Sequence, residues 1–471
     1  MKDLSYEAVM ARQNEIIRQA VGLDYDQFEK ADHTFDYEAL MASVPYDLEE
    51  VCEILDKMHV GKTPLVYLDN ITALARKVAP EGKGAKIYIK DEAANPSGSF
   101  KARRAALSVY EAKRLGYKGV IAATSGNYGA AVAAMAAKLG LKCIVVQECF
   151  DSRRVGQPEI LEKQRKCEAL GAEVIQLSVG PELFYETLKL LEETGYYNAS
   201  LYTATAIAGV ESLGYEIVQQ GMEAFGRHPD YVIATNAGGG NLTGTARGLR
   251  KAGATETKVY AASVDLSGLH MASDHDFNRK SFTTGHTGFG IPFTVQPDRS
   301  DVPRNAARPL RYIDNYMTLK QGEVFFITES LAALEGMERG PAGNTSLAAA
   351  FALAQTLDQD QIIVVQETEY TGAGKHPMPQ LSFARDNGID IRLGDPEEEV
   401  PGKNIILPDH PSKIKARFWD MASLRKSALK RLVAAMDDKI TADQAQYLQE
   451  ELNCDLDFLG QALGELGKQL A

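Results

Sequence analysis

The sequence predicts an α/β fold built on parallel β-sheets. Short runs rich in β-branched residues alternate with amphipathic helical segments, and several of these runs end in turns rich in glycine, serine and asparagine. Strands that alternate with helices form parallel sheets that are covered on both faces. Ligand sites in such sheets lie at the carboxyl ends of the strands. The predicted strands are residues 86–91, 120–124, 143–148, 173–177, 231–235, 259–264 and 362–367.

The chain of 471 residues is long enough for two or three domains. Residues 1–60 are charged and helical in pattern, and they carry no chemical motif. The strand–helix alternation extends from about residue 61 to 400. A proline- and glutamate-rich stretch at 396–402 indicates a boundary to a helical C-terminal extension, 401–471. In that extension a basic amphipathic segment covers 412–436, and Thr441 and Gln444 have the spacing of a capping box.

The composition excludes several classes of protein. A net charge of −13 argues against nucleic acid or an anionic membrane as partner, because both repel an acidic surface. The five cysteines are irregularly spaced, which is typical of reduced thiols and not of a zinc site. The N-terminal segment lacks the apolar run of a signal peptide, and the stretch 119–140 is too polar to span a bilayer. We therefore expect a cytoplasmic protein.

The most informative motif is Asn-Pro-Ser-Gly-Ser-Phe-Lys-Ala-Arg-Arg at residues 95–104. It follows the predicted strand 86–91 and opens a predicted helix over 102–114. A lysine at such a turn can be held against a bound aldehyde cofactor, with which its amine forms a Schiff base. An isolated Ser-x-Lys would instead indicate a surface lysine. The prediction that Lys101 is reactive therefore depends on the turn residues that precede it.

Two further turns follow predicted strands and open helices. The sequence Thr124-Ser125-Gly126-Asn127 precedes a helix whose free backbone N–H groups attract anions, although Ser125 or Asn127 would also serve as an ordinary helix cap. Residues 236–244 contain three consecutive glycines, which let backbone amides close around a phosphate. The alternative for this loop is a flexible turn or a tight helix–strand contact.

These motifs resemble those of the fold-type II pyridoxal-phosphate enzymes, which include threonine synthase, cysteine synthase and diaminopropionate ammonia-lyase. The resemblance rests on residues 95–101 together with the preceding Lys-Thr-Pro-Leu at 62–65. It implies the tryptophan synthase beta-like fold, with a large domain formed by 61–100 and 206–400 and a smaller domain formed by 101–205. It also implies pyridoxal 5'-phosphate as the cofactor and Lys101 as the residue that binds it covalently and later carries protons.

The resemblance also implies a role for each turn. Thr124, Ser125 and Gly126 would hold the substrate carboxylate, and Asn127 would contact the ring oxygen of the cofactor. The phosphate would lie in the cradle made by Gly238, Gly239, Gly240, Asn241 and Leu242. A hydroxyl that follows the strand 362–367 would face the pyridine nitrogen. The sequence Thr-Gly-x-Gly-Lys at 371–375 favours Thr371 for this contact, and Thr368 is the alternative.

To about residue 410 the chain resembles one group in this family, the β subunits of 2-amino-4-ketopentanoate thiolase. The stretches that carry this resemblance are 95–104, 236–248, 264–274, 281–292, 340–346 and 366–375. It implies cleavage of 2-amino-4-oxopentanoate by coenzyme A to acetyl-CoA and D-alanine in ornithine degradation. It further implies a small α subunit as partner, in a homodimer or a larger hetero-oligomer. Ala102 departs from the aspartate of many family members, which leaves the Lys101 amine unaffected.

Residues 265–290 have no counterpart in the wider family. The stretch is rich in glycine, threonine and histidine, and a loop of this length in a compact domain is more often functional than not. His270 and His286 are candidates for proton transfer and for stabilising negative charge on the C4 oxygen. Structural histidines are the alternative for both.

Another activity would use the same motifs. A β-eliminating ammonia-lyase or a threonine-synthase-like lyase would share Lys101, Asn127 and the glycine loop. A non-catalytic subunit is disfavoured, because such a chain would tolerate loss of the lysine and this one keeps every predicted cofactor motif.

Overall fold

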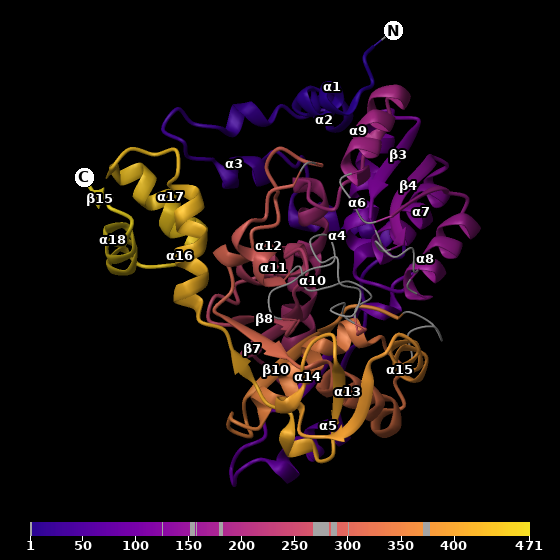
Figure 1. Ribbon diagram of the computed structural model, residues 1–471, viewed down its shortest axis with the longest axis vertical. Helices are drawn as coiled ribbons and strands as arrows, with labels where there is room; N and C mark the ends of the chain where they lie inside the picture. The colour runs from indigo at the N-terminus through magenta and orange to yellow at the C-terminus, as the bar shows by residue number, and fades with distance from the viewer. Residues whose placement is uncertain are drawn as a thin grey trace.

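The computed structural model describes residues 2–124, 126–150, 156, 158–178, 182–266, 282–283, 290–299, 301–370 and 377–471. Two main β-sheets with helices around them confirm the predicted α/β class (Figure 1). Among the described residues, no helix combines the length and the apolar character that crossing a membrane requires.

The larger sheet has seven strands within the described residues, in the order β1-β2-β10-β7-β8-β9-β13. The inner pairs are parallel, and the edge strands β1 and β13 are antiparallel to their neighbours. The predictions for β2, β7 and β10 match the observed bounds, whereas β1, β9 and β13 were not predicted. The strands are β1 (Leu65–Tyr67), β2 (Lys86–Asp91), β7 (Tyr231–Thr235), β8 (Lys258–Val264), β9 (Asn315–Leu319), β10 (Ile362–Glu367) and β13 (Arg417–Phe418).

Helices cover both faces of this sheet. The helices α5 (Asp69–Val78), α13 (Gln321–Glu335) and α14 (Pro341–Ala354) pack together on one face, and α10 (Ala204–Phe225) and α11 (Gly240–Lys251) lie on the other. A cluster of buried hydrophobic side chains lies on each face of the sheet, and the side chains of β10 alternate between the two clusters. Ile363 and Val365 belong to the cluster on the α14 face, and Ile362 and Val364 belong to the cluster on the α10 face. Burial of both faces explains why β10 is apolar without alternation.

The smaller sheet is parallel throughout, in the order β5-β4-β3-β6. The prediction of strands at 120–124, 143–148 and 173–177 is confirmed within two residues at each end. Its strands are β3 (Gly119–Ala123), β4 (Lys142–Phe150), β5 (Glu173–Ser178) and β6 (Tyr197–Asn198), and the neighbouring helices are α6 (Lys101–Arg114), α7 (Asn127–Leu139), α8 (Pro158–Ala169) and α9 (Glu182–Thr194).

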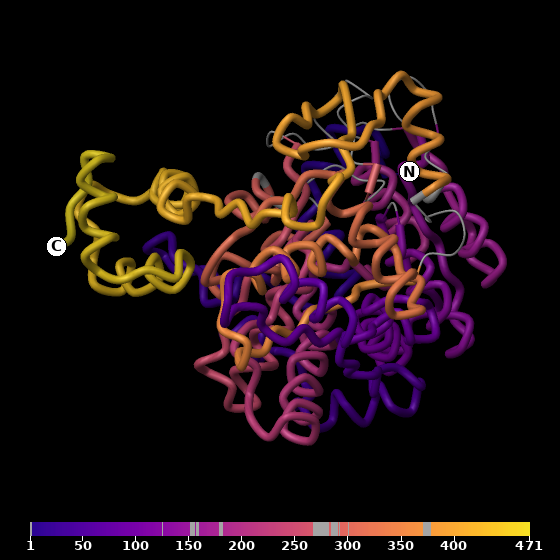
Figure 2. The backbone as a smooth tube through the Cα atoms, turned by 90° about the horizontal axis from the view of Figure 1, so that it is seen from below, coloured from indigo at the N-terminus to yellow at the C-terminus, as the bar shows by residue number. Residues whose placement is uncertain are grey.

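Helical extensions stand at both ends of the chain, and the C-terminal one projects to one side of the molecule (Figure 2). The Nε2 of Gln444 donates to the carbonyl of Asp32 at 2.7 Å, which joins the two extensions. The predicted capping box of Thr441 and Gln444 is confirmed. The extensions contain α1 (Tyr6–Ala11), α2 (Gln13–Val21), α3 (Tyr37–Ala42), α4 (Leu48–Lys57), α16 (Met421–Leu432), α17 (Ala442–Leu452), α18 (Leu456–Glu465), β14 (Lys439–Ile440) and β15 (Gln469–Leu470).

The first residues of the predicted C-terminal extension are strands and not helix. The strand β12 (Asn404–Pro408) pairs with β11 (Asp390–Gly394), and β13 pairs with β9 of the larger sheet. The expectation of a helical extension from residue 401 onward is therefore wrong before α16, which begins at Met421. Pairing with existing strand edges stabilises this segment as β-structure, and Pro411 begins a 3-10 turn between β12 and β13. The remaining α-helices are α12 (Gly290–Val295) and α15 (Pro377–Asp386).

Four charged side chains, three of them buried and one partly buried, lie together next to the start of α6. The Arg103 side chain is fully buried, and its guanidinium donates to both carboxylate oxygens of Glu92 at 2.7 and 2.8 Å. It also donates to both oxygens of Glu216 on α10, each at 2.8 Å. Lys90 at the end of β2 donates to Glu216 at 2.8 Å. This network joins β2, α6 and α10 two residues beyond Lys101.

The ionised state of Glu216 depends on its partners. Burial alone would raise the pKa of Glu216, but the charges of Arg103 and Lys90 lower it to about 2. Burial lowers the pKa of Lys90, against the opposing effect of Glu216. Removing one partner of such a network leaves an uncompensated buried charge.

We expect Glu216→Gln to lower the free energy of unfolding by about 3 kcal/mol at neutral pH. The pKa of Glu216 is near its ordinary 4.5 when unfolded and about 2 when folded. The stabilisation is therefore complete above about pH 4.5 and declines as the pH falls toward about 2. The loss of unfolding free energy caused by the substitution is measured by urea unfolding at about pH 7, 5.5 and 3.5. This loss should be equal at the first two pH values and smaller at the third.

Glu223→Gln is the matched control, because Glu223 lies on the same helix and is exposed. That substitution should change the free energy of unfolding by less than about 0.5 kcal/mol. If Glu216→Gln lowered the free energy of unfolding equally at all three pH values, the result would contradict an ionised Glu216.

Candidate active site

Lys101 is the first residue of α6, and its position is fixed by the segment that follows β10. The N–H of Phe100 donates to the carbonyl of Thr368 at 3.0 Å, and the N–H of Tyr370 donates to the carbonyl of Gly98 at 2.7 Å. Gly98 has a φ of +77°, and a Cβ atom there would lie 3.2 Å from the Tyr370 carbonyl oxygen. A side chain would therefore strain this turn. The glycine allows Lys101 to lie beside the end of β10.

A second turn joins β3 to α7. Thr124 and Asn127 are buried there, and the N–H of Gly126 donates to Oγ1 of Thr124 at 3.3 Å. A Cβ atom on Gly129 would lie 2.8 Å from Cγ1 of Val145, so α7 packs closely on β4. The start of α7, with its free N–H groups, consequently lies beside the buried Thr124.

The third turn, at 236–240, leads from β7 into α11, and three other segments contact its glycines. A Cβ atom on Gly238 would lie 2.0 Å from Oη of Tyr202. One on the glycine at 239 would lie 2.4 Å from Cγ of Pro309, and one on the glycine at 240 would lie 2.4 Å from Nη2 of Arg104. The second glycine also has a φ of +80°. Side chains are therefore excluded from the loop, and its backbone is left open to a ligand.

Among the residues that the structure describes, neither polar atom of the Asn241 side chain, in the first turn of α11, has a hydrogen-bond partner, although only 5% of the residue is exposed. Leaving a buried amide unpaired costs about 1–3 kcal/mol. The start of α11 also offers backbone N–H groups that favour an anion. The glycine loop and Asn241 therefore fit the phosphate group of a cofactor.

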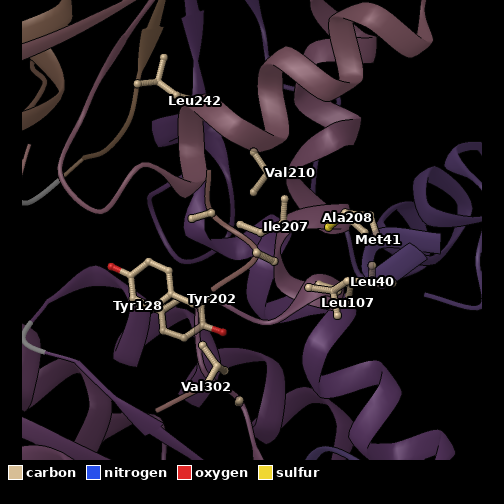
Figure 3. Close-up of a cluster of buried hydrophobic side chains, with 14 of the residues drawn as sticks. Leu40, Met41, Leu107, Tyr128, Tyr202, Ile207, Ala208, Val210, Leu242 and Val302 are labelled. Atoms are coloured by element: carbon tan, nitrogen blue, oxygen red, sulfur yellow. The ribbon is translucent and has the colours of Figure 1, made fainter. Parts of the chain in front are cut away.

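Most of the predicted site residues meet in one cavity of about 210 Å³. Leu242 does not line it, because its side chain is fully buried in the hydrophobic cluster of α10, α11 and α6 (Figure 3). Ser125, His270, His286 and Thr371 lie outside the residues that the structure describes. The predicted residues that line the cavity are Lys101, Thr124, Gly126, Asn127, Gly238, Gly239, Gly240, Asn241 and the alternative Thr368.

Several charged and aromatic residues of the cavity were not predicted from the sequence. Arg104 stands three residues after Lys101, a spacing that places both on one face of a helix and could have revealed it. Glu148 lies near the carboxyl end of β4, where ligand sites gather in parallel sheets. Tyr202 and Arg299 lie in segments without a motif, and only the tertiary structure brings them together. Further lining residues include Thr235, Asn236, Ser263, Thr345 and Glu369.

Arg299 lies among aromatic rings at the cavity wall. Its guanidinium carbon is 4.7 Å from the ring centre of Phe184 and 4.8 Å from that of Tyr202. Its Nη1 donates to the Tyr202 hydroxyl at 3.2 Å, and its Nε lies 3.5 Å from a carboxylate oxygen of Asp301. Burial would lower the pKa of Arg299, but Tyr202 and Asp301 raise it. The wall near the glycine loop therefore carries a fixed positive charge.

Arg104 is a second cation in the wall, with 3% of the residue exposed. Among the described residues no carboxylate forms an ion pair with it. Its Nε has no hydrogen-bond partner within those residues, and its Nη1 donates to the carbonyl of Leu201 at 3.4 Å. Burial lowers the pKa of Arg104 to about 10, so the side chain is protonated at neutral pH.

The chain is similar to known proteins over its whole length. The family model for pyridoxal-phosphate dependent enzymes matches residues 57–369. A protein of Acetoanaerobium sticklandii named 2-amino-4-ketopentanoate thiolase beta subunit is 66% identical over 466 residues, or 99% of both chains. A protein with the same name from an unknown prokaryotic organism is 60% identical over 470 residues, or 100% of both chains. A tryptophan synthase beta chain of Rhodopseudomonas palustris is 32% identical over 46% of this chain and 55% of its own length.

Solved structures share the fold. A threonine deaminase has 24% sequence identity and a TM-score of 0.53, with 69% of this chain and 98% of that chain covered. A pyridoxal 5'-phosphate-dependent aspartate racemase has 19% identity and a TM-score of 0.55, with 71% and 98% covered. The predicted fold-type II architecture is confirmed. By its family match and its full-length relatives, the chain belongs to the pyridoxal-phosphate dependent enzymes, in the group of the 2-amino-4-ketopentanoate thiolase beta subunits.

Proposed function

We propose that the protein catalyses the cleavage of 2-amino-4-oxopentanoate by coenzyme A to acetyl-CoA and alanine, a step of ornithine degradation. The single observation that carries the proposal is the 66% identity, over 99% of both chains, with a named thiolase beta subunit. In this reaction the C3–C4 bond breaks and a bond forms between the thiol sulfur and C4. The proton of the thiol is balanced by the one gained at C3.

Lys101 is proposed as the residue that holds the cofactor and moves protons. Pyridoxal phosphate, when bound, supplies an electron sink for negative charge next to the substrate amino group. The Lys101 amine would hold the cofactor aldehyde and, once displaced by the substrate amine, would move a proton at the α-carbon. The pairing of residues 98–100 with 368–370 supports this role, because it fixes the start of α6 at the cavity.

The starts of two helices are proposed to orient two anions. Thr124, Ser125 and Gly126 would hold the substrate carboxylate before α7, with Asn127 beside the cofactor ring oxygen. The loop 238–242 would hold the phosphate, with backbone groups at Leu242 and the unpaired amide of Asn241. Free N–H groups at a helix start favour negative charge, which supports both assignments.

The groups that act on the C4 ketone and on coenzyme A are also proposals. His270 and His286 would stabilise negative charge on the C4 oxygen and move protons near neutral pH. The relatives are named beta subunits, which implies an α subunit as partner. We propose that a small α subunit takes part in coenzyme A binding. The assembly would be a homodimer of this chain or a larger hetero-oligomer. We also propose that the product is D-alanine and that the enzyme is cytoplasmic.

Replacement of Lys101 by alanine should abolish covalent attachment of pyridoxal phosphate. The wild-type protein should show a visible absorption band that borohydride bleaches, and mass spectrometry should find the reduced adduct on the peptide that contains Lys101. Lys113→Ala is the matched control, because Lys113 lies exposed near the end of the same helix. An adduct on another side chain would contradict the assignment.

The purified protein, combined with its α subunit, should convert 2-amino-4-oxopentanoate and coenzyme A to acetyl-CoA and alanine in equal amounts. Lys101→Ala measures the background rate, which we expect to be at least about 1000-fold lower, because both cofactor attachment and proton transfer are lost. Release of pyruvate from serine or 2,3-diaminopropionate without any acetyl-CoA would instead support a β-eliminating lyase.

One of two threonines should interact with the pyridine nitrogen. Thr368 lines the cavity, and Thr371 is the residue favoured by the sequence motif. Of Thr368→Val and Thr371→Val, one should shift the absorption maximum of the bound cofactor and lower kcat about tenfold, through loss of one hydrogen bond. The other should change kcat by less than about twofold. If neither substitution changed kcat or the absorption maximum, neither hydroxyl would make this contact.

A further inference from the structure

Arg104 is a buried cation that lies against the positive end of a helix. Its Nη2 lies 2.4 Å from the position that a Cβ atom of Gly240 would take, and Gly240 is the first residue of α11. The start of this helix of 12 residues carries partial positive charge on its free N–H groups. A guanidinium at this place is unfavourable for the protein alone, and it becomes favourable when an anion binds to both groups.

The protein supplies little compensation for this charge. Within the described ranges Arg104 has no carboxylate partner, and its Nε has no acceptor. The neighbouring Arg103 on the same helix donates to both oxygens of two carboxylates, so its charge is compensated, in contrast to that of Arg104. The side chain of Asn241, in the same cavity wall, also lacks hydrogen-bond partners in the described part of the chain. Near the start of α11, Nε of Arg104 and the side-chain amide of Asn241 are therefore buried donors without an acceptor among the described residues.

We propose that Arg104 binds the phosphate group of pyridoxal phosphate, together with Asn241 and the N–H groups at the start of α11. A phosphate offers several acceptor oxygens, and a guanidinium can donate two parallel hydrogen bonds to it. The inference rests on the cofactor site of the proposed function and adds a charged ligand to a cradle otherwise made of backbone and amide groups. Arg104 would also keep the bound phosphate dianionic below its ordinary second pKa of about 6.

Arg104→Gln should weaken the binding of pyridoxal phosphate and leave the binding of pyridoxal, which lacks the phosphate, almost unchanged. For the apoenzyme titrated with each compound, we expect the Kd of pyridoxal phosphate to rise at least about tenfold and that of pyridoxal to change by less than about twofold. Arg104→Lys should give an intermediate Kd, because lysine keeps the charge without the planar fork. Arg250→Gln is the matched control, because Arg250 is exposed near the far end of α11.

Phosphorus NMR of the holoenzyme gives a readout that is independent of turnover. The phosphate chemical shift of the wild type should stay constant between about pH 5.5 and 8.5. In Arg104→Gln, loaded with excess cofactor, the shift should titrate with a pKa closer to about 6. If Arg104→Gln does not fold, the same measurement is made on Arg104→Lys and on the wild type. A wild-type phosphate that titrates near pH 6 would overturn the proposal.

Two other results would overturn it. Equal weakening of pyridoxal phosphate and pyridoxal would show that the substitution damages the cavity as a whole. An unchanged Kd of pyridoxal phosphate with a raised KM for the amino acid would place Arg104 at the substrate carboxylate. These measurements need no acetyl-CoA assay, so a failure of the proposed thiolysis with normal cofactor binding would be seen separately.

Discussion

The active site depends on the buried contact of Arg103 with Glu92 and Glu216. This contact ties α6 to the turn that follows β2 and to α10, and α6 begins with Lys101. In a helix, Lys101 and Arg104 share one face while Arg103 points elsewhere. The ion network therefore anchors one side of the helix, and the opposite side can present an amine and a guanidinium to the cavity. Burial of Arg103 and Glu92 is tolerated because each has a partner of opposite sign.

The cavity is assembled from both sheets. The starts of α6 and α7, next to the smaller sheet, and the start of α11, next to the larger one, contribute to its wall (Figure 1). Ends of parallel strands gather such helix starts in one place. Three helices thus direct free N–H groups or side chains from their first turns toward one space, which suits a ligand with a carboxylate at one end and a phosphate at the other.

The sequence alone predicted much of this architecture, because buried parallel strands are continuous apolar runs. The strands β2, β7 and β10 have this character, and their bounds were predicted without error. The edge strands β1 and β13 have two or three residues, too few for a pattern, and β9 mixes polar with apolar residues. The segment 404–418 was expected to join a helical extension, but pairing with β11 and β9 determines its structure.

The site was predictable where chemistry follows a local motif. The turns at Lys101, Asn127 and Gly238 each follow a strand, and the structure brings them to one cavity. Tyr202 and Arg299 could not be found this way, since they lie almost 100 residues apart and meet only through tertiary packing. Leu242 belongs to the same loop motif, but the turn of α11 directs its side chain into the core (Figure 3).

The crowding around the glycines at 238–240 has a consequence for how this protein can diverge. Each glycine faces an atom from a different part of the chain, namely Tyr202, Pro309 and Arg104. A larger residue in the loop is tolerated only if the opposing residue shrinks in the same lineage. Homologous sequences should therefore vary at these positions in matched pairs, and a lone change on either side should be rare.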